Sequence, residues 1–348
     1  MEVLQMIVEL IWDWSRTVFG TIFVACVLMS LALLIIELVL YRKKSARQET
    51  AEAAGAQTGR DTVRIALITG ASSGLGKTFA LQIDQGEADI DEIWLIARRR
   101  ERLKEAAAEL SLPARVIPMD VTEEESIRRL EKLLEGGEYC EGMEPGNPAA
   151  EAVPVSGSHP RTIQVGIFAN CAGYAKIGNY EKISRFDSAN MIDLNCRAAV
   201  NTTLAVLPHM RAGDRILEIC STAAFQPIQH MNLYAASKAF LYSYTRALRM
   251  ELLPRGVVVT AVCPWWVKDT EFISVASHNE ANPDVKSAVR SFPLVTKEDQ
   301  VVKRALRASR RRLAVSTPGI MCFLHRLLGK VIPKKWLLYC WELFRRIG

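Results

Sequence analysis

The chain has 348 residues, of which 49% are hydrophobic, and its formal net charge is +6. One large α/β core with appended segments fits this length. The positive charge is concentrated at the carboxyl-terminal end, because residues 303–348 hold twelve Lys or Arg and one acid. That segment is also rich in Leu, Ile, Trp and Phe, so it favours an anionic membrane surface and argues against nucleic acid. The eight cysteines and five histidines show no metal-ligand spacing, which predicts buried thiols in a reducing compartment and no metal site.

An apolar run occupies residues 18–41, after a short leader at 1–17. At 1.5 Å per residue, a helix of this length crosses a ~30 Å hydrocarbon core. A cleaved signal peptide is the alternative, but the leader carries three acids in place of a basic region. Cations after the run outnumber those before it, so we expect a single-pass membrane protein with its catalytic domain on the cytoplasmic side. Residues 42–62 lack apolar periodicity and are interpreted as a flexible linker.

The catalytic domain, placed at 63–318, begins with a buried-strand pattern at 64–68 and a glycine-rich turn. A helical run follows from Lys77, which gives the turn the context of a phosphate-binding loop, where backbone N–H groups approach a pyrophosphate. The residues expected to bind the cofactor there are Gly70, Ser72, Ser73, Gly74, Leu75 and Gly76. An ordinary turn is the alternative interpretation.

The next predicted strand, 92–97, ends in three arginines, where an NAD-selective site would carry an acid. A guanidinium can bind a 2′-phosphate bidentately, so we expect NADP(H) as the cofactor, with Arg98 and Arg99 as contacts. Alternatively, these arginines are surface cations that begin the following helix.

Two further strands are expected at 115–119 and 163–169, and their carboxyl ends lie where a doubly wound sheet presents its ligand crevice. The residues expected to meet the cofactor there are Asp120, Val121, Asn170, Ala172 and Gly173. Residues 135–162, between the two strands, are rich in Gly, Pro and Glu and predict a mobile surface insertion.

Tyr234 and Lys238 lie four residues apart, on one face of a helix expected at 234–252. Ser221 follows a strand expected at 215–219 and can be brought against them. A free phenol titrates near ~10, so proton transfer at neutral pH needs a neighbouring cation that favours the phenolate. For this pair by itself, a solvated helix surface is the alternative.

Strands and helices alternate along the domain, with a helix at 187–210 and a last strand pair at 257–262 and 313–317. This order predicts an α/β fold, a Rossmann-type doubly wound parallel sheet preceded by a single transmembrane helix. Over residues 65–317 the chain resembles the short-chain dehydrogenase/reductase family. The motifs that carry the resemblance are Thr69-Gly70-x-x-x-Gly74-x-Gly76, Asp120, Asn170-x-Ala172-Gly173, Asn195, Ser221, Tyr234-x-x-x-Lys238 and Pro264.

The resemblance implies a role for each of these residues. Tyr234 would act as general acid/base, and Lys238 would lower its pKa and hold the nicotinamide ribose. Ser221 would bind the substrate oxygen, and Asn195 would support a proton-relay water. Other contacts implied with the cofactor or the central sheet come from Asp120, Val121, Asn170, Pro264, Val267 and Thr270.

One departure from the family pattern follows Pro264. Trp265 and Trp266 stand where the family usually has glycine, whose conformations tryptophan does not adopt as cheaply. Thr270 lies one residue later than the family's carboxamide-binding Thr. We expect Trp265 or Trp266 to wall the substrate pocket, with a core position as the alternative.

The segment 319–348 mixes large apolar residues with lysine and arginine. An amphipathic tail at a membrane interface fits this mixture, with Trp336 and Trp341 at headgroup depth. Packing on the substrate loop or on a second copy of the chain is the alternative, and the two interpretations are compatible.

The predicted function is an NADP(H)-dependent oxidoreductase that interconverts a ketone and a secondary alcohol on a lipophilic, steroid-like or long-chain acyl substrate. Within the family, the combination resembles membrane-associated hydroxysteroid dehydrogenases, long-chain 3-ketoacyl reductases and 3-ketosphinganine reductases. A catalytically silent dinucleotide-binding membrane regulator and an NAD-dependent alcohol dehydrogenase are the alternatives. The expected partners are the substrate and the membrane, with a homodimer left open.

Overall fold

The computed structural model describes residues 62–87, 89–136, 162–268, 270–277 and 295–347, with scattered positions between 20 and 32. The chain divides into two compact units, 1–60 and 61–348, and the second contains the whole sheet. Within the described part of the chain, no helix has both the length and the apolar character to cross a bilayer. Apart from those scattered positions and Thr62, the leader, transmembrane helix and linker predicted at 1–62 lie outside the described residues, as does most of the insertion predicted at 135–162.

Nine strands are described, and all their pairings are parallel. They are β1 (Thr62–Thr69), β2 (Glu92–Ala97), β3 (Ala114–Pro118), β4 (Thr162–Asn170), β5 (Arg215–Ile219), β6 (Val258–Val262), β7 (Val267–Lys268), β8 (Thr296–Lys297) and β9 (Val315–Ser316). Seven of them form one sheet in the order β3-β2-β1-β4-β5-β6-β9, while β7 and β8 pair separately. The predicted Rossmann-type sheet is therefore confirmed, and its strand order reverses between β1 and β4.

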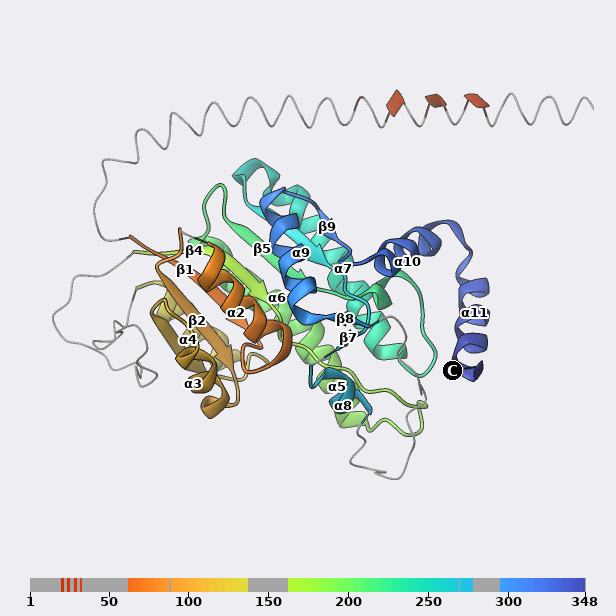
Figure 1. The fold of residues 1–348 in the computed structure, drawn as a ribbon, viewed down its shortest axis with the longest axis horizontal. Helices are drawn as coiled ribbons and strands as arrows, with labels where there is room; N and C mark the ends of the chain where they lie inside the picture. The colour runs from red at the N-terminus through yellow and green to blue at the C-terminus, as the bar shows by residue number, and fades with distance from the viewer. Residues whose placement is uncertain are drawn as a thin grey trace, which may run out of the picture. The chain divides into compact units, whose positions relative to one another are not determined.

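Helices cover both faces of this sheet (Figure 1). Those given bounds are α2 (Gly74–Gly86), α3 (Arg100–Ala108), α4 (Glu124–Leu134), α5 (Arg185–Ile192), α6 (Ala199–Val206), α7 (Asn232–Leu252), α8 (Phe272–Ser277), α9 (Glu298–Arg310), α10 (Ile320–Val331) and α11 (Lys334–Ile347). Short 3₁₀ turns span Leu207–His209, Thr222–Phe225 and Leu253–Arg255. Helices α2, α3 and α9 pack on one face and α4, α6 and α7 on the other.

Side-chain alternation along β1 fixes this layering. Ile65 and Leu67 join the core under α4, α6 and α7, whereas Ala66 and Ile68 join the core under α2, α3 and α9. Successive side chains of a strand point to opposite faces, so a strand covered on both sides is apolar throughout. The carboxyl ends of β1, β4 and β5 consequently meet at one edge, where the glycine turn and Ser221 follow them.

The helix predicted as continuous over 187–210 is divided. A π-helical segment, Asp193–Ala198, separates α5 from α6. Asn195 lies within it and is fully buried. Its amide oxygen accepts a hydrogen bond from Tyr174 N at 3.1 Å, and its Nδ2 donates to Tyr174 O at 2.9 Å. Such local widening is common where a helix aims a side chain at a functional site, and hydrophobic periodicity gives no sign of it.

Candidate active site

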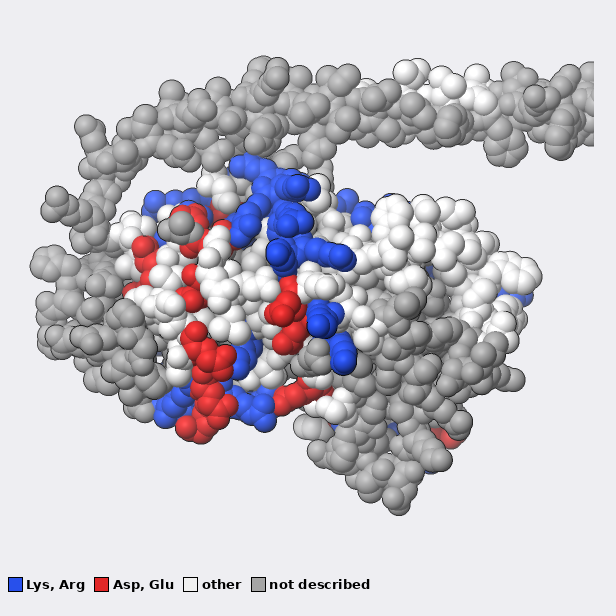
Figure 2. All heavy atoms as spheres, in the orientation of Figure 1, with Lys and Arg blue, Asp and Glu red and all other residues white. Residues whose placement is uncertain are grey.

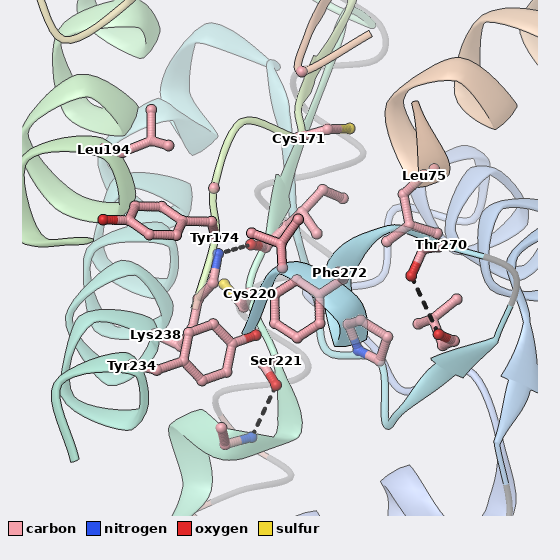
Figure 3. Close-up of a pocket in the computed structure, with 18 of the residues that line it drawn as sticks. Leu75, Cys171, Tyr174, Leu194, Cys220, Ser221, Tyr234, Lys238, Thr270 and Phe272 are labelled. Carbon is pink, nitrogen blue, oxygen red and sulfur yellow. Dashed lines mark hydrogen bonds between the residues drawn. The ribbon is translucent and has the colours of Figure 1, made fainter. Parts of the chain in front are cut away.

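Tyr234 and Lys238 project from the first turns of α7 into the edge of the sheet, and both side chains are buried (Figure 3). The Lys238 Nζ atom lies 5.9 Å from the centre of the Tyr234 ring and donates a hydrogen bond to Ile219 O at 2.8 Å. Burial excludes the solvated helix surface as an interpretation of this pair. A lysine placed so deeply still keeps donors free for a ligand hydroxyl, because its ammonium carries three protons.

Ser221 follows β5 and faces the Tyr234 hydroxyl (Figure 3). Its Oγ accepts a hydrogen bond from Ala223 N at 3.1 Å, which caps the short turn that begins at Thr222. The Ser221 hydroxyl favours ionisation of the phenol, but burial outweighs it and raises the pKa of Tyr234 well above its ordinary value. Burial also lowers the pKa of Lys238. In this structure burial therefore dominates the pKa of Tyr234 and keeps the phenol protonated, and the lowering of that pKa by Lys238 stays a prediction.

One cavity of about 1210 Å³ lies over this edge of the sheet. It exceeds the ~300–1,000 Å³ of a typical small-ligand pocket, so cofactor and substrate fit together. Its lining includes Ser221, Tyr234, Lys238 and every residue predicted to bind the cofactor except Asn170. Asn170 instead lies under the edge: it accepts a hydrogen bond from Thr69 Oγ1 at 2.8 Å and donates one to Glu218 at 3.0 Å. Asn195 is also outside the lining, behind Tyr174.

The glycine turn is closed tightly enough to require its last glycine. A Cβ atom added at Gly76 would lie 2.3 Å from Gly70 O, which no side chain tolerates. This packing sets the start of α2 against the end of β1 and directs its first N–H groups at the cavity. A dinucleotide pyrophosphate fits this position.

Arg99 points at the same turn. Its guanidinium donates to Ser72 Oγ at 3.1 Å and to Ser73 Oγ at 2.8 Å. These three side chains present only donor and hydroxyl groups, which suits a phosphate. Arg98 instead forms an ion pair with Asp120 at 3.6 Å, with 70% of its side chain exposed. Both arginines line the cavity, but only Arg99 is tied to the turn by a described contact, and their contact with NADP(H) stays a prediction.

Glu271 is a residue of the site that no sequence pattern indicated. Its carboxylate accepts hydrogen bonds from Arg99 at 2.8 Å and from Arg102 at 2.7 Å. The two arginines lower the pKa of Glu271. The neighbouring Phe272 lies with its ring centre 5.5 Å from that of Tyr234. A contact across 172 residues leaves no periodic signal, so only the position of an acid directly after Thr270 could have suggested it.

The substrate side of the cavity is walled by tryptophans and by the carboxyl-terminal helices. Trp265 and Trp266 are both half-buried and line it, so the pocket-wall interpretation holds for both. The ring centre of Trp265 lies 5.3 Å from that of His325 on α10, in an edge-on arrangement. Burial lowers the pKa of His325 to about 4, so the imidazole is neutral.

Helix α11 closes the wall. Trp341 is buried and its Nε1 donates to Gln229 O at 3.2 Å, so placing this residue at membrane headgroup depth was wrong. It packs in the cluster that contains Tyr234. The alternative in which the tail packs on the substrate side is therefore correct for Trp341, while Trp336 is 63% exposed.

Burial of the thiols is confirmed for Cys196, Cys220, Cys263 and Cys322, whereas Cys340 is exposed. Desolvation raises the pKa of Cys196 and Cys263, which makes them poor nucleophiles. Among the described residues, no group of His, Cys, Asp or Glu could hold a metal ion.

A glycine turn, a phosphate-compatible arginine and a buried Tyr-Lys pair around one cavity on a doubly wound sheet define a nicotinamide dinucleotide-dependent oxidoreductase. The sequence profile described as short chain dehydrogenase matches residues 64–135 and 155–281. The chain belongs to this family.

Relatives and solved structures agree with that assignment. An oxidoreductase of Staphylococcus epidermidis is 30% identical over 209 residues, which cover 59% of this chain and 78% of the relative. A short-chain dehydrogenase from Sphingobium yanoikuyae, solved with NADPH, is 26% identical with a TM-score of 0.56, covering 78% of this chain and 97% of that one. One from Streptomyces avermitilis, at 21% identity and a TM-score of 0.60, covers 82% of this chain and 99% of its own and shares the fold.

Proposed function

We propose that this protein uses NADP(H) to interconvert a ketone and a secondary alcohol on a lipophilic substrate, at a membrane. The observation that carries the proposal is the convergence of Tyr234, Ser221 and Lys238 on a cavity whose other end holds Arg99. The nicotinamide, when bound, supplies or accepts the hydride at the carbonyl carbon. The chain then has to orient the oxygen, move one proton and exclude water.

In the reductive direction Tyr234 gives its proton to the carbonyl oxygen, and C=O becomes CH–OH. Burial raises the pKa of the phenol and keeps this proton in place at neutral pH, so proton donation depends on neighbours that stabilise the phenolate left behind. Ser221 donates a hydrogen bond to the same oxygen and positions it against the phenol. Lys238, held by Ile219 O, has donors left for a ribose hydroxyl and stabilises the phenolate that remains. Asn195 fixes the backbone at Tyr174 beside them.

NADP(H) is proposed over NAD(H) because arginines follow β2 and Arg99 converges there with Ser72 and Ser73, with Glu271 as its present ion-pair partner. Arginine at this place binds a 2′-phosphate and has no partner on a plain ribose. The Sphingobium relative, which was solved with NADPH, is consistent with this choice.

A lipophilic substrate is proposed because large apolar side chains line the cavity opposite the glycine turn. They are Ile228, Met231, Trp266, Phe272, Leu337 and Trp341. Apolar walls with a few convergent polar groups select ligands by shape and buried area. Steroid-like and long-chain acyl ketones both meet this requirement.

The test is an activity screen of lipid extracts with NADPH, with products identified by mass spectrometry. Tyr234→Phe should retain NADPH binding and lose about 10²–10⁴-fold in kcat. Tyr244→Phe is the matched control, since this tyrosine lies on the same helix outside the cavity and its buried hydroxyl has no hydrogen-bond partner among the described residues. NADPH binding without turnover of any lipid would favour the silent regulator, and unchanged turnover in Tyr234→Phe would refute the mechanism.

A further inference from the structure

Helices α10 and α11 carry large apolar side chains that no other described part of the chain buries. We call this set the C-terminal apolar face, formed by Ile320, Phe323, Leu327, Val331, Trp336, Tyr339 and Leu343. Val331 is 72% exposed and Trp336 63%. Scattered exposed apolar residues are ordinary, but these share one face of α10 and one face of α11 by their helical spacing, and such a concentration marks an interaction surface.

Helices α10 and α11 pack against the catalytic domain through their other side, so the exposed apolar face is not the result of helices that have come away from the core. A Cβ atom added at Gly329 would lie 3.0 Å from both Cβ and O of Phe225, which places α10 directly against the turn that follows Ser221. On the inner side, Cys322, Leu337 and Trp341 are buried. The helices thus have one face packed on the catalytic domain and one face without a described partner.

The cavity opens beside this face. Leu324 and Leu328 both line the cavity, yet they are 40% and 44% exposed. Cys340 on α11 has the same double character, since it lines the cavity and is exposed. Residues that contact both the interior and the surface form a rim. One route between the surroundings and Tyr234 therefore runs past side chains of α10 and α11, while Phe186 and Val275 are exposed lining residues elsewhere on the rim.

The surface around the apolar face is basic. Arg326, Lys330, Lys334 and Lys335 lie on α10 and α11, where Glu342 is the one acid of residues 320–343. Figure 2 shows lysine and arginine gathered over α9 and an uncharged surface over α10 in the same view. The exposed cations of α9 are Lys303, Arg304, Arg307 and Arg310, and Arg311 follows the helix.

This charge distribution selects the partner. A second copy docked through the same surface would bring like charges together, which costs free energy. An anionic bilayer offers negative headgroups to the cations and acyl chains to the apolar residues, with tryptophan and tyrosine at the boundary. Helices that lie in a membrane interface have this same combination of large apolar residues on one side and lysine or arginine beside them.

We infer that the C-terminal apolar face docks on an anionic lipid bilayer and that the substrate passes from the bilayer, between Leu324, Leu328 and Cys340, to Tyr234. The inference rests on the proposed function for the identity of the substrate. It narrows the substrate to a membrane-dissolved ketone whose apolar chain trails through this rim. The docking itself does not depend on turnover.

The test uses the full chain reconstituted into phosphatidylcholine vesicles, with or without phosphatidylglycerol, that contain brominated acyl chains. Bromine quenches tryptophan emission at short range, and the difference between wild type and Trp336→Phe isolates the signal of Trp336. We expect this signal to be quenched, more strongly with phosphatidylglycerol. Phe323→Asp combined with Leu327→Asp should abolish the quenching, whereas Met250→Asp, on an exposed apolar residue of α7, should not.

Kinetics of the same variants test the entry route. Phe323 and Leu327 lie outside the cavity lining, so the double substitution should raise KM for a vesicle-dissolved long-chain ketone about 10-fold and leave a short water-soluble ketone unaffected. If bromine does not quench Trp336 emission, the docking is overturned. It is also overturned if the double variant loses an oligomer that the wild type forms while the quenching stays unchanged, because the face would then belong to a contact between two copies of the chain. Equal effects on both ketones would overturn the entry route. Absence of turnover in wild type would refute the proposed function and leave the quenching result valid.

Discussion

The carboxylate of Glu271 accepts a hydrogen bond from Arg99, with 2.8 Å between Oε2 and Nη1. Arg99 is also the residue proposed to bind the 2′-phosphate of NADP(H), so the carboxylate and the phosphate compete for one guanidinium. Glu271 precedes Phe272, which packs beside Tyr234. The arginine proposed to select the cofactor is therefore linked to the segment that packs beside Tyr234.

Glu271→Gln should tighten NADPH binding, because it frees Arg99 and removes a negative charge near the phosphate. The Arg99 and Glu271 side chains are 46% and 38% exposed, and exposed ion pairs contribute ~0–1 kcal/mol. We expect a gain of up to about 5-fold in NADPH affinity and none for NADH, measured by calorimetry. Glu109→Gln is the control, since Glu109 pairs with Lys77 outside the cavity. Equal changes in NADPH and NADH affinity would show that Glu271 does not act on the site of the 2′-phosphate.

Titration of the catalytic phenol should show that burial dominates over Lys238. The pKa of Tyr234 is raised by desolvation, so in the protein without cofactor this side chain stays protonated above the ~10 of a free tyrosine. Tyrosinate absorbance of wild type and Tyr234→Phe should superimpose up to about pH 10. Excess tyrosinate in wild type at lower pH would mean that the field of Lys238 outweighs burial. Tyr244→Phe serves as the baseline for loss of another buried tyrosine.

Glu218 gives the fold a pH dependence of its own. It is fully buried on β5, where it accepts hydrogen bonds from Asn170 at 3.0 Å and Thr203 at 2.7 Å. Burial raises its pKa to about 7, above the ~4.3 of an exposed glutamate. Since the folded-state pKa is the higher one, this group's contribution to stability is complete below about 4 and is lost as the pH rises through about 7.

Glu218→Gln should remove this dependence. Glutamine keeps an oxygen to accept from Asn170, and its amide can donate to the Thr203 hydroxyl, whose own proton then goes to Ala199 O. The variant should match wild type near pH 5 and exceed it by about 1–3 kcal/mol near pH 8, by urea unfolding at the two pH values. A variant that is less stable at both values would show that the buried charge is well stabilised where it is.

The sequence was sufficient wherever a function depends on neighbours along the chain. The glycine turn, the arginines after β2 and the Tyr234-Lys238 spacing are local patterns, and the structure brings their residues to one cavity. Contacts between distant segments were not predictable in the same way. Glu271 meets Arg99 because the loop after β7 folds over the glycine turn, and His325 meets Trp265 because α10 packs beside Ser221. Amphipathic periodicity showed that the tail has two faces but not which of them would be covered.

Gly329→Val should lift α10 from the catalytic domain, because a Cβ at this position would already lie 3.0 Å from Phe225 O. In an open helix position, replacing glycine would stabilise by up to ~1 kcal/mol or cost little; here the backbone contact reverses the sign. The wall formed by Leu324, His325 and Leu328 would move with the helix. We expect a lower melting temperature and a several-fold higher KM for an apolar ketone, while the NADPH affinity stays constant. Met250→Val, at an exposed helix position of α7 outside the cavity, controls for the β-branched side chain. If both variants retain the wild-type KM, the position of α10 does not shape the substrate site.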